Sequence, residues 1–576
     1  MKPLTLVTPY SSGPFFEKTL LSLTKSALVE RVLIVEPHGQ SPRHPTLRSN
    51  GANLPSNVGT GRPKLEGPST AGISQPYDSP PSRTETCSGL PLSSVLPSAL
   101  KDSARRRRMG QEPVHLKIPK CHTLLAEPLP SHETLSLILG EARTKYLLLL
   151  PETQQISIEP KALERILGKA ESTKAGLVYS DFYDVTERGK ILHPLNDYQP
   201  GSVRDDFDFG AMILFSVPAV RKSLKKYGVI PGVKFAGLYD LRLKVSIDHS
   251  VTHLQEPLYC VIGTDEPSYE PLGGEKMFAY VDPRHEAVQK EMESVFTDYL
   301  KKIGAYLPSH HLGHFREVEQ IPKSFSVEAS VVIPVRNRKE TIAEAVKSGL
   351  SQETDFPFNV LVVDNHSTDG TTAVLSDLAR QYSNLKHIIP KRTDLGIGGC
   401  WNEAVHDEAC GRYAVQLDSD DLYSSPHTLQ KMVDTLHQGN YAMVIGSYTL
   451  VDSRLEEIPP GLISHREWTD ENGHNNALRI NGLGAPRAFN TGLMRKIGFL
   501  NVSYGEDYAA ALQICREYRI GRIYESLYFC RRWSGNTDAT LSIEEANRND
   551  AFKDKIRTTE ILARQKMTKG IGQKAY

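Results

Sequence analysis

The fold of this chain is decided by residues 330–371, which read SVVIPVRNRKETIAEAVKSGLSQETDFPFNVLVVDNHSTDGT. Two apolar runs, 331–334 and 360–363, enclose a segment at 340–351 whose apolar residues have helical spacing. A second helix is predicted over 371–382 and a third strand over 413–417. Apolar strands joined by helices are typical of an α/β protein with a mostly parallel sheet covered on both faces. In such sheets ligands bind beyond the carboxyl ends of the strands.

The composition excludes several classes of function. The chain has 576 residues with 68 basic and 68 acidic side chains, so no nucleic-acid partner is expected. No apolar run approaches the roughly 18 residues that cross a membrane, and the first apolar stretch is too short for a signal peptide, so we expect a cytoplasmic location. The seven cysteines are scattered without a C-x-x-C pair, which argues against both a disulfide framework and a thiolate zinc site.

The two halves of the chain resemble each other in order and spacing. Residues 4–9 match 330–334, residues 32–36 match 360–364, and residues 144–150 match 411–417. The offset in residue number between matching positions is larger before a Pro-, Ser- and Arg-rich segment at 38–113 than after it, by about the length of that segment. The segment is predicted to be disordered. We therefore expect two copies of one domain.

The predicted organisation has four parts. A first domain covers 1–300 and contains the insert at 38–113, a linker covers 301–327, a second domain covers 328–545, and a helical tail covers 546–576. The tail mixes charges on all sides, which favours a packed or solvated helix over a membrane anchor.

Acidic side chains follow two predicted strands of the second half. Asp364 comes directly after one strand and is either a ligand for a ribose or base or a turn residue, whereas Asp369 is the expected cap of the next helix. Asp418, Asp420 and Asp421 follow another strand within four positions. Because like charges this close repel unless a cation neutralises them, a divalent ion such as Mg²⁺ or Mn²⁺ is predicted here.

Two further segments carry candidate site residues. Glu506 and Asp507 open a helix predicted over 508–518, where they either cap the helix or supply a general base. Residues 391–402 contain three glycines but have neither dinucleotide-fold nor P-loop spacing. The glycines are predicted to let the backbone approach a ligand closely, and Arg392 either reaches a base or phosphate or lies in solvent.

Taken in order, these motifs resemble the family 2 glycosyltransferases, which share the nucleotide-sugar-dependent type A fold. The resemblance rests on five motifs between 329 and 540, namely Val331–Asn337, Val362–Asn365 with Ser367 and Asp369–Thr371, Leu395–Asn402, Asp418–Asp420, and Gly505–Tyr508. It implies two tandem type A domains, each a mostly parallel sheet flanked by helices.

The resemblance also implies roles for individual residues. The residues assigned to the nucleotide-sugar are Pro334, Val335, Asp364, Arg392, Asp418 and Glu506. Asp418 and Asp420 would hold Mn²⁺ or Mg²⁺ at the sugar diphosphate. Asp507 would be the catalytic base of an inverting transfer, taking the proton of an acceptor hydroxyl.

Two departures from the family pattern concern the second half. A histidine common near the final strand is absent from the run Arg531–Trp533, where Trp533 could stack on a sugar or base, and Trp401 replaces an arginine. The first half departs further, because Pro151, Glu152 and Thr153 stand where the second half has Asp418–Asp420. Glu36 replaces Asp364 and Asp240 remains opposite Asp507, so the first half is interpreted as a degenerate copy.

The sequence thus predicts an inverting, metal-dependent glycosyltransferase acting from a nucleoside-diphosphate sugar to a glycan or lipid-linked acceptor, in cell-surface polysaccharide biosynthesis. A lipid-linked acceptor would bring the chain to the inner face of a membrane. The alternative is a non-catalytic glycan-binding or scaffold protein with two degenerate domains. A nucleotidyltransferase would require a Gly-rich loop after the first strand, and Val335–Arg338 is not one.

Overall fold

The computed structural model describes residues 2–11, 14–37, 118–151, 155–187, 189–262, 285–308, 315–318, 325–533, 535–536 and 541–574. The insert predicted at 38–113 lies outside these residues, and so do Glu152 and Thr153.

The N-terminal half, up to α7, contains two sheets. Its elements are β1 (Leu4–Pro9), α1 (Pro14–Lys25), β2 (Val29–Pro37), β3 (Cys121–Ala126), α3 (His132–Glu141), β4 (Tyr146–Leu149), β5 (Gln155–Ile158), α4 (Ala162–Thr173), β6 (Leu177–Ser180), β7 (Phe182–Thr186), β8 (Gly189–His193), β9 (Ile213–Ser216), α5 (Val217–Tyr227), α6 (Gly237–Asp248), β10 (Val251–Leu254), β11 (Tyr259–Ile262) and α7 (Glu286–Ile303). The strand orders are β10-β6-β9-β4-β1-β2-β3 and β5-β11-β7-β8.

The C-terminal half, from β12 onward, contains one larger sheet. Its elements are β12 (Ala329–Val335), α8 (Ile342–Leu350), β13 (Phe358–Asp364), α9 (Thr371–Gln381), β14 (Leu385–Ile388), α10 (Ile397–His406), β15 (Tyr413–Gln416), β16 (Leu422–Tyr423), α11 (Thr428–Gly439), β17 (Met443–Val451), β18 (Glu457–Ile463), α12 (Gly473–Asn476), β19 (Arg487–Asn490), α13 (Thr491–Ile497), α14 (Glu506–Glu517), β20 (Ile520–Arg531) and α15 (Ile543–Lys574). The strand order is β14-β13-β12-β15-β19-β17-β20-β16, with β18 paired to β17.

The strands of the two halves follow the same order. In each half six parallel strands enclose one antiparallel strand at the same place, which is β9 in the first half and β19 in the second. The order β5-β11-β7-β8 also matches β16-β20-β17-β18, because the long strands β17 and β20 run on where the N-terminal half starts new strands. Both main sheets are mostly parallel, as the sequence predicts.

The predicted strands and helices of the C-terminal half are confirmed by β12, α8, β13, α9 and β15. The helix expected from residue 508 begins earlier, at Glu506, so Glu506 and Asp507 lie in its first turn. The boundary predicted at 300/301 falls within α7, and the one at 545/546 falls within α15.

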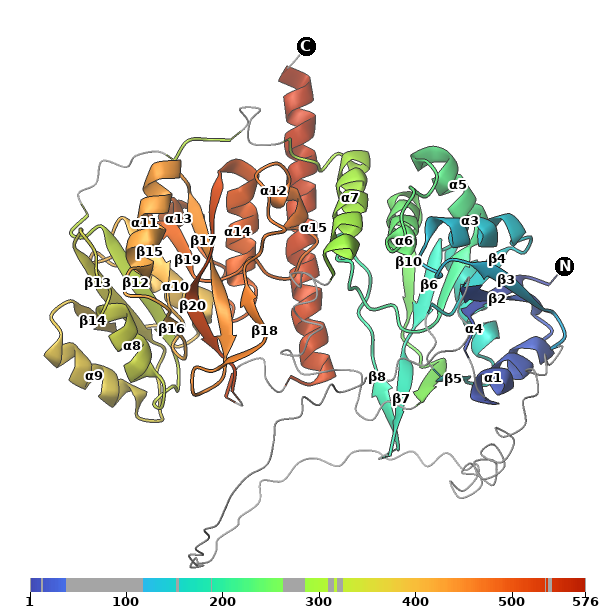
Figure 1. The fold of residues 1–576 in the computed structure, drawn as a ribbon, viewed down its shortest axis with the longest axis horizontal. Coiled ribbons are helices and arrows are strands. Elements are labelled where there is room, and N and C mark those ends of the chain that lie inside the picture. The colour runs from blue at the N-terminus through green and yellow to red at the C-terminus, as the bar shows by residue number, and fades with distance from the viewer. Residues whose placement is uncertain are drawn as a thin grey trace, which may run out of the picture. The chain divides into compact units, whose positions relative to one another are not determined.

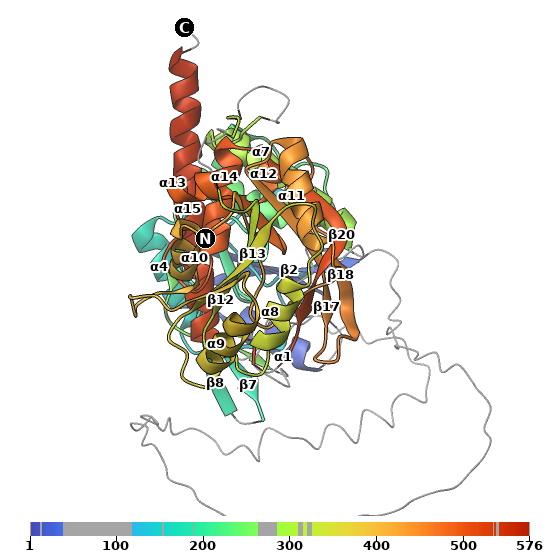
Figure 2. The ribbon, with the colours of Figure 1, turned by 90° about the vertical axis from the view of Figure 1, so that its left-hand side faces the viewer.

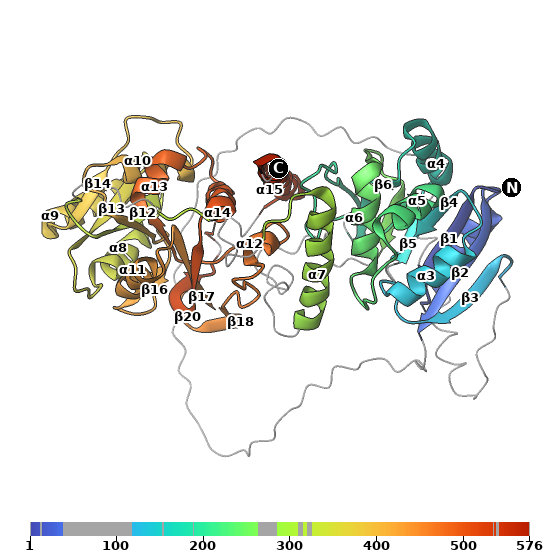
Figure 3. The ribbon, with the colours of Figure 1, turned by 90° about the horizontal axis from the view of Figure 1, so that it is seen from above.

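The central strands of this half bury both faces. Val331 and Ile333 pack with α8, whereas Val332 packs with α10, because successive side chains of a strand point to opposite faces. Figure 3 shows α8 and α10 on opposite sides of β12 and β13, and Figure 2 shows α9 beside α8. This arrangement leaves the carboxyl ends of the strands open for the loops that follow them.

The tail predicted from the sequence is the helix α15, which packs beside α14 (Figure 1). Arg557 and Arg564 on this helix are fully buried, so of the two expected arrangements, packed or solvated, the helix shows the packed one. Within the described part of the chain, no helix is both long and apolar enough to span a membrane.

Candidate active site

The carboxyl ends of three neighbouring strands bring the predicted site residues to one edge of the sheet. Val335 at the end of β12 pairs with Asp364 at the end of β13, and Val332 pairs with Gln416 at the end of β15. Asp418 follows two residues after Gln416. The pairing therefore brings Asp364 and the segment that carries Asp418 to the same edge of the sheet.

The loops after β12 and β13 are hydrogen-bonded to each other. The Asn337 amide donates to Ser367 Oγ at 2.9 Å, and Asn337 Oδ1 accepts from the Thr368 amide at 2.8 Å. Asp369 accepts from the amides of Lys339, at 3.0 Å, and of Thr371, at 2.9 Å. The N-cap of α9 is Gly370 and not Asp369 as predicted, because the helix begins one residue later. Asp369 instead accepts from the first amide of the helix and holds the loop that follows Pro334 and Val335.

Asp364 is fully buried and binds its own loop. Its carboxylate accepts from the Ser367 amide at 3.0 Å and from Thr372 Oγ1 at 2.6 Å, and it lies 3.3 Å from His387 Nε2. Although burial opposes ionisation, these hydrogen bonds hold the pKa of Asp364 well below its usual range. Asp364 therefore orders the loop, and its contact with a nucleotide stays a prediction.

Three carboxylates gather after β15. Both oxygens of Asp418 accept from Gln416 Nε2, at 3.0 and 3.1 Å, and Asp421 accepts from the Arg531 amide at 2.8 Å. Burial and the charge of Asp420 raise the pKa of Asp418, and burial together with both neighbouring carboxylates raises the pKa of Asp421 well above its usual value. The cluster is thus short of positive charge, as expected of a place that accepts a cation.

Asp420 is surrounded by hydrogen-bond donors. Trp533 Nε1 and Asn536 Nδ2 each lie 3.4 Å from Asp420 Oδ2, and Arg338 Nε lies 3.6 Å from the same oxygen. Trp533 therefore contacts the acidic cluster, while its stacking on a sugar or base stays a prediction.

Glu506 and Asp507 begin α14 after Gly505, whose φ of +79° suits a glycine. Glu506 is buried, and burial beside Asp507 raises its pKa to about 8. Asp507 is partly exposed, and its Oδ2 lies 2.6 Å from Arg487 Nη2. Although burial acts to raise it, the charges of Arg487 and Lys553 hold the pKa of Asp507 below its usual value. The surroundings thus favour the ionised form of Asp507 and the protonated form of Glu506.

Arg487 connects the two acidic regions, and the sequence analysis missed it. Besides Asp507, it contacts Gln416, because Arg487 Nη1 donates to Gln416 Oε1 at 2.9 Å. Gln416 in turn binds Asp418. The available signal was one polar residue in each of two buried strands, Gln416 in β15 and Arg487 in β19. The sequence order does not reveal that β19 lies between β17 and β15 and pairs antiparallel with both.

The glycine-rich segment packs against neighbouring backbone. A Cβ added at Gly398 would lie 1.9 Å from the Leu500 carbonyl oxygen, and one added at Gly396 would lie 2.5 Å from the Val502 carbonyl carbon. These glycines therefore let α10 approach the 500–502 backbone, and their close approach to a ligand stays a prediction. Arg392 is exposed and pairs with Asp394 at 2.7 Å, so its contact with a nucleotide also stays a prediction.

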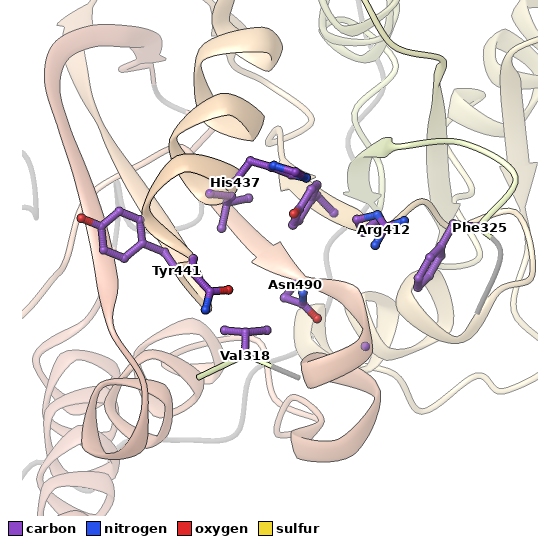
Figure 4. Close-up of a pocket in the computed structure, with 10 residues that line it drawn as sticks. Val318, Phe325, Arg412, His437, Tyr441 and Asn490 are labelled. Atoms are coloured by element: carbon purple, nitrogen blue, oxygen red, sulfur yellow. The ribbon is translucent and has the colours of Figure 1, made fainter. Parts of the chain in front are cut away.

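A cavity shown in Figure 4 lies elsewhere on this half. It is lined by Arg412 and Tyr413, at the amino end of β15, with His437, Tyr441 and Asn490. The carboxylates lie beyond the opposite end of β15, so this cavity is separate from the candidate site. Among the residues that the structure describes, no three His, Cys, Asp or Glu side chains are grouped to hold a metal ion.

The matching position in the N-terminal half has a different environment. Asp240, opposite Asp507, is buried in α6 and lies 2.7 Å from Lys244 Nζ. This lysine lies one turn further along the same helix, and burial raises the pKa of Asp240 although Lys244 acts to lower it.

Comparisons with known proteins point to glycosyltransferases. Residues 330–497 match the family described as glycosyl transferase family 2. An uncharacterized protein of Mycobacterium tuberculosis is 31% identical over 107 residues, which are 19% of this chain and 31% of that protein. Dolichol-phosphate mannosyltransferase of Saccharomyces cerevisiae is 29% identical over 146 residues, 25% of this chain and 49% of that protein.

A third relative carries a more specific name. GalNAc(5)-diNAcBac-PP-undecaprenol beta-1,3-glucosyltransferase of Campylobacter jejuni is 30% identical over 119 residues, 20% of this chain and 37% of that protein. The chain spans less than half the length of these relatives. A crystal structure of S. aureus TarS 1-349 in complex with UDP-GlcNAc is 22% identical, with a TM-score of 0.32, over 41% of this chain and 72% of that one. The match to the glycosyl transferase family 2 model lies within the C-terminal half of the chain.

Proposed function

We propose that the C-terminal half transfers a sugar from a nucleoside-diphosphate sugar to a hydroxyl group of a glycan or lipid-linked acceptor, with inversion at the anomeric carbon. The observation that carries this proposal is the chain of contacts from Asp507 through Arg487 and Gln416 to Asp418. It puts an ionised carboxylate beside the acidic cluster at the edge of the sheet where α/β proteins bind ligands.

Asp507 is the proposed general base. The acceptor hydroxyl loses its proton to Asp507 as its oxygen bonds to the anomeric carbon, and the bond from that carbon to the diphosphate oxygen breaks. The nucleoside diphosphate leaves with the electron pair. Arg487 keeps Asp507 ionised for this step, and general-base catalysis is typically worth about 10²–10⁴ in rate.

Asp418 and Asp420 are the proposed ligands of Mn²⁺ or Mg²⁺. Two carboxylates with substrate phosphate are a usual environment for such an ion, and the raised pKa of Asp418 marks a negative cluster that is not fully compensated. When bound, the ion supplies positive charge to the leaving diphosphate. Pro334, Val335, Asp364, Arg392 and Glu506 are the remaining residues proposed to contact or shape the donor site.

The acceptor is proposed to be lipid-linked, in cell-surface polysaccharide biosynthesis on the cytoplasmic side of a membrane. Support comes from the named lipid carriers of the yeast and Campylobacter relatives. Peripheral association through such an acceptor needs no membrane span.

The N-terminal half is proposed to be a degenerate second copy of the same domain. The shared strand order, with one antiparallel strand at the same place, supports a duplication. The burial of Asp240, whose side chain is 3% exposed against 29% for Asp507, supports loss of the base, since a buried carboxylate cannot reach an acceptor hydroxyl. This half would then serve structure or acceptor binding.

The test is a calorimetric titration with UDP-, GDP- and dTDP-sugars, with and without Mn²⁺. We expect metal-dependent binding of one nucleotide class, which Asp420→Asn abolishes and the exposed control Asp434→Asn retains. Asp507→Asn should keep donor binding but lower the rate of sugar transfer about 10²–10⁴-fold. Absence of binding by every nucleotide would contradict the proposal and favour a non-catalytic glycan-binding role.

A further inference from the structure

We propose that α15 is a positioning element, through which the N-terminal half holds Lys553 beside the catalytic base Asp507. The proposal rests on the function proposed above. It assigns the N-terminal half a part in catalysis that does not require a second active site.

One face of α15 is held by the loop that follows β8 in the N-terminal half. Side chains and amides of 194–204 bind helix positions spaced by three or four residues, which lie on one face. The contacts are Asn547 Nδ2 to the Pro194 carbonyl at 2.6 Å, Gln199 Nε2 to the Ala551 carbonyl at 2.9 Å, Ser202 Oγ to Asp554 at 2.7 Å, the Gly201 amide to Thr558 Oγ1 at 2.7 Å, and Arg204 to Asp550 at 3.0 Å.

The loop itself is anchored on α6. Tyr239 donates to the Val203 carbonyl at 2.5 Å, and the buried Arg242 donates to the Ser202 carbonyl at 3.0 Å and to the Arg204 carbonyl. These residues flank Asp240, the counterpart of the base. Asp240 thus lies on α6, the helix that anchors the loop bound to α15.

Another face of α15 contacts the helix that carries the base. Arg557 Nε donates to the Tyr508 hydroxyl at 3.1 Å, and Arg516 of α14 pairs with Glu560 at 2.6 Å. Lys553 Nζ donates to the Asn481 carbonyl at 2.7 Å and lies 4.5 Å from the centre of the Tyr504 ring and 5.7 Å from that of Tyr508. Lys553 therefore stands over both ends of the segment 504–508 that contains Asp507.

The charged groups facing Asp507 come from three elements. Arg487 is on β19, Lys553 is on α15, and Glu506 precedes the base on α14. Arg487 is held by Gln416 within the C-terminal half. The position of Lys553 depends on α15. Because residues 194–204 of the N-terminal half hold α15, the position of Lys553 also depends on that loop.

Gly201 fixes how closely the loop approaches the helix. A Cβ at this position would lie 1.9 Å from the Asp554 carbonyl oxygen and 2.3 Å from the Thr558 amide nitrogen. Both atoms belong to backbone, so even one methyl group must displace loop from helix. Gly140 on α3 offers a matched control, because a Cβ there meets nothing within 4 Å.

The test measures the pH dependence of kcat/KM in the full chain. Lys553→Met removes a positive charge that favours the ionised form of Asp507. The pKa of Asp507 should rise, so the acid limb of the kcat/KM profile should move to higher pH by on the order of one unit. Gly201→Ala should move it in the same direction, because the shifted helix carries Lys553 away. The exposed neighbour variant Lys555→Met and the control Gly140→Ala should leave the limb where it is.

Each outcome decides the proposal. If the acid limb of the kcat/KM profile does not move in Lys553→Met, the proposal is overturned. If it moves in Lys553→Met but not in Gly201→Ala, and Gly201→Ala is folded, the part assigned to the N-terminal half is overturned. If Gly201→Ala does not fold, Ser202→Ala removes the bond to Asp554 alone and is judged by the same criterion.

A second readout separates this proposal from the proposed function. If the wild-type chain transfers no sugar, the function fails, and urea unfolding midpoints at several pH values still report on Asp507. The stabilising effect of Lys553 should then fall as the pH drops below about 4, where the carboxylate becomes protonated. Asp507→Asn should abolish that fall. If the fall persists in the Asp507→Asn background, Lys553 does not act through the charge of Asp507 and the proposal is overturned.

Discussion

At the scale of single residues, the two adjacent carboxyl groups at the start of α14 are set apart by their surroundings. Asp507 reaches Arg487 and stays ionised, whereas Glu506 is buried and, in the described part of the chain, its Oε2 has no hydrogen-bond partner. Ionising Glu506 would place two negative charges side by side, and burial of Glu506 opposes its ionisation. One residue is thereby kept charged and the other neutral, which is how a single site can hold a base without excess repulsion.

The raised pKa of Glu506 predicts a pH-dependent gain in stability for Glu506→Gln. The unfolded chain ionises this group at its ordinary pKa, near 4.5, whereas the folded chain does so only at about 8. The wild type therefore loses stability as the pH rises between these values, and the variant does not. We expect urea unfolding to show an advantage for Glu506→Gln of a few kcal/mol at pH 9 that vanishes near pH 4.5. The exposed control Glu408→Gln should show none, and an advantage independent of pH would contradict the prediction.

At the scale of elements, α15 is a helix with polar residues on every side, and several of them are buried. Asp554 and Arg557 pair at 2.8 Å with no exposed side-chain surface, and Arg204 Nε lies 3.6 Å from Asp554. Asp554→Ala leaves these arginines buried with fewer partners and should lower the free energy of unfolding by about 3–5 kcal/mol. Asp377→Ala on α9 breaks an exposed pair with Arg380 and should cost about 0–1 kcal/mol. Equal effects in chemical denaturation would show that the α15 pair is not buried in solution.

The same elements show what the sequence could predict and where it could not. The strands β12, β13 and β15 and the helices α8 and α9 were readable because apolar spacing reports which face is buried. The pairing of β19 was not, since an antiparallel neighbour far along the chain leaves no periodic signal, and Arg487 was missed with it. The two-sided contacts of α15 were also hidden, because buried ion pairs and solvated charges look alike in a sequence.

At the scale of the whole molecule, the shared strand order makes the connection from β2 to β3 equivalent to the connection from β13 to β14. The crossover from β13 to β14 spans 365–384 and contains α9, while the equivalent crossover from β2 to β3 spans 38–120. The pairing of β2 with β3 therefore needs only a connection long enough to return along one strand.

We predict that a Gly/Ser linker of about 12 residues can replace 39–117, because parallel strands can be joined by a crossover of that length. The shortened chain should keep its urea unfolding midpoint and its metal-dependent donor binding, since every contact of α15 with 194–204 is retained. Sugar transfer to an acceptor provides the decisive comparison. Unchanged donor binding with lost transfer would assign the replaced segment to the acceptor, whereas a lowered unfolding midpoint would contradict the view that the sheet is complete without it.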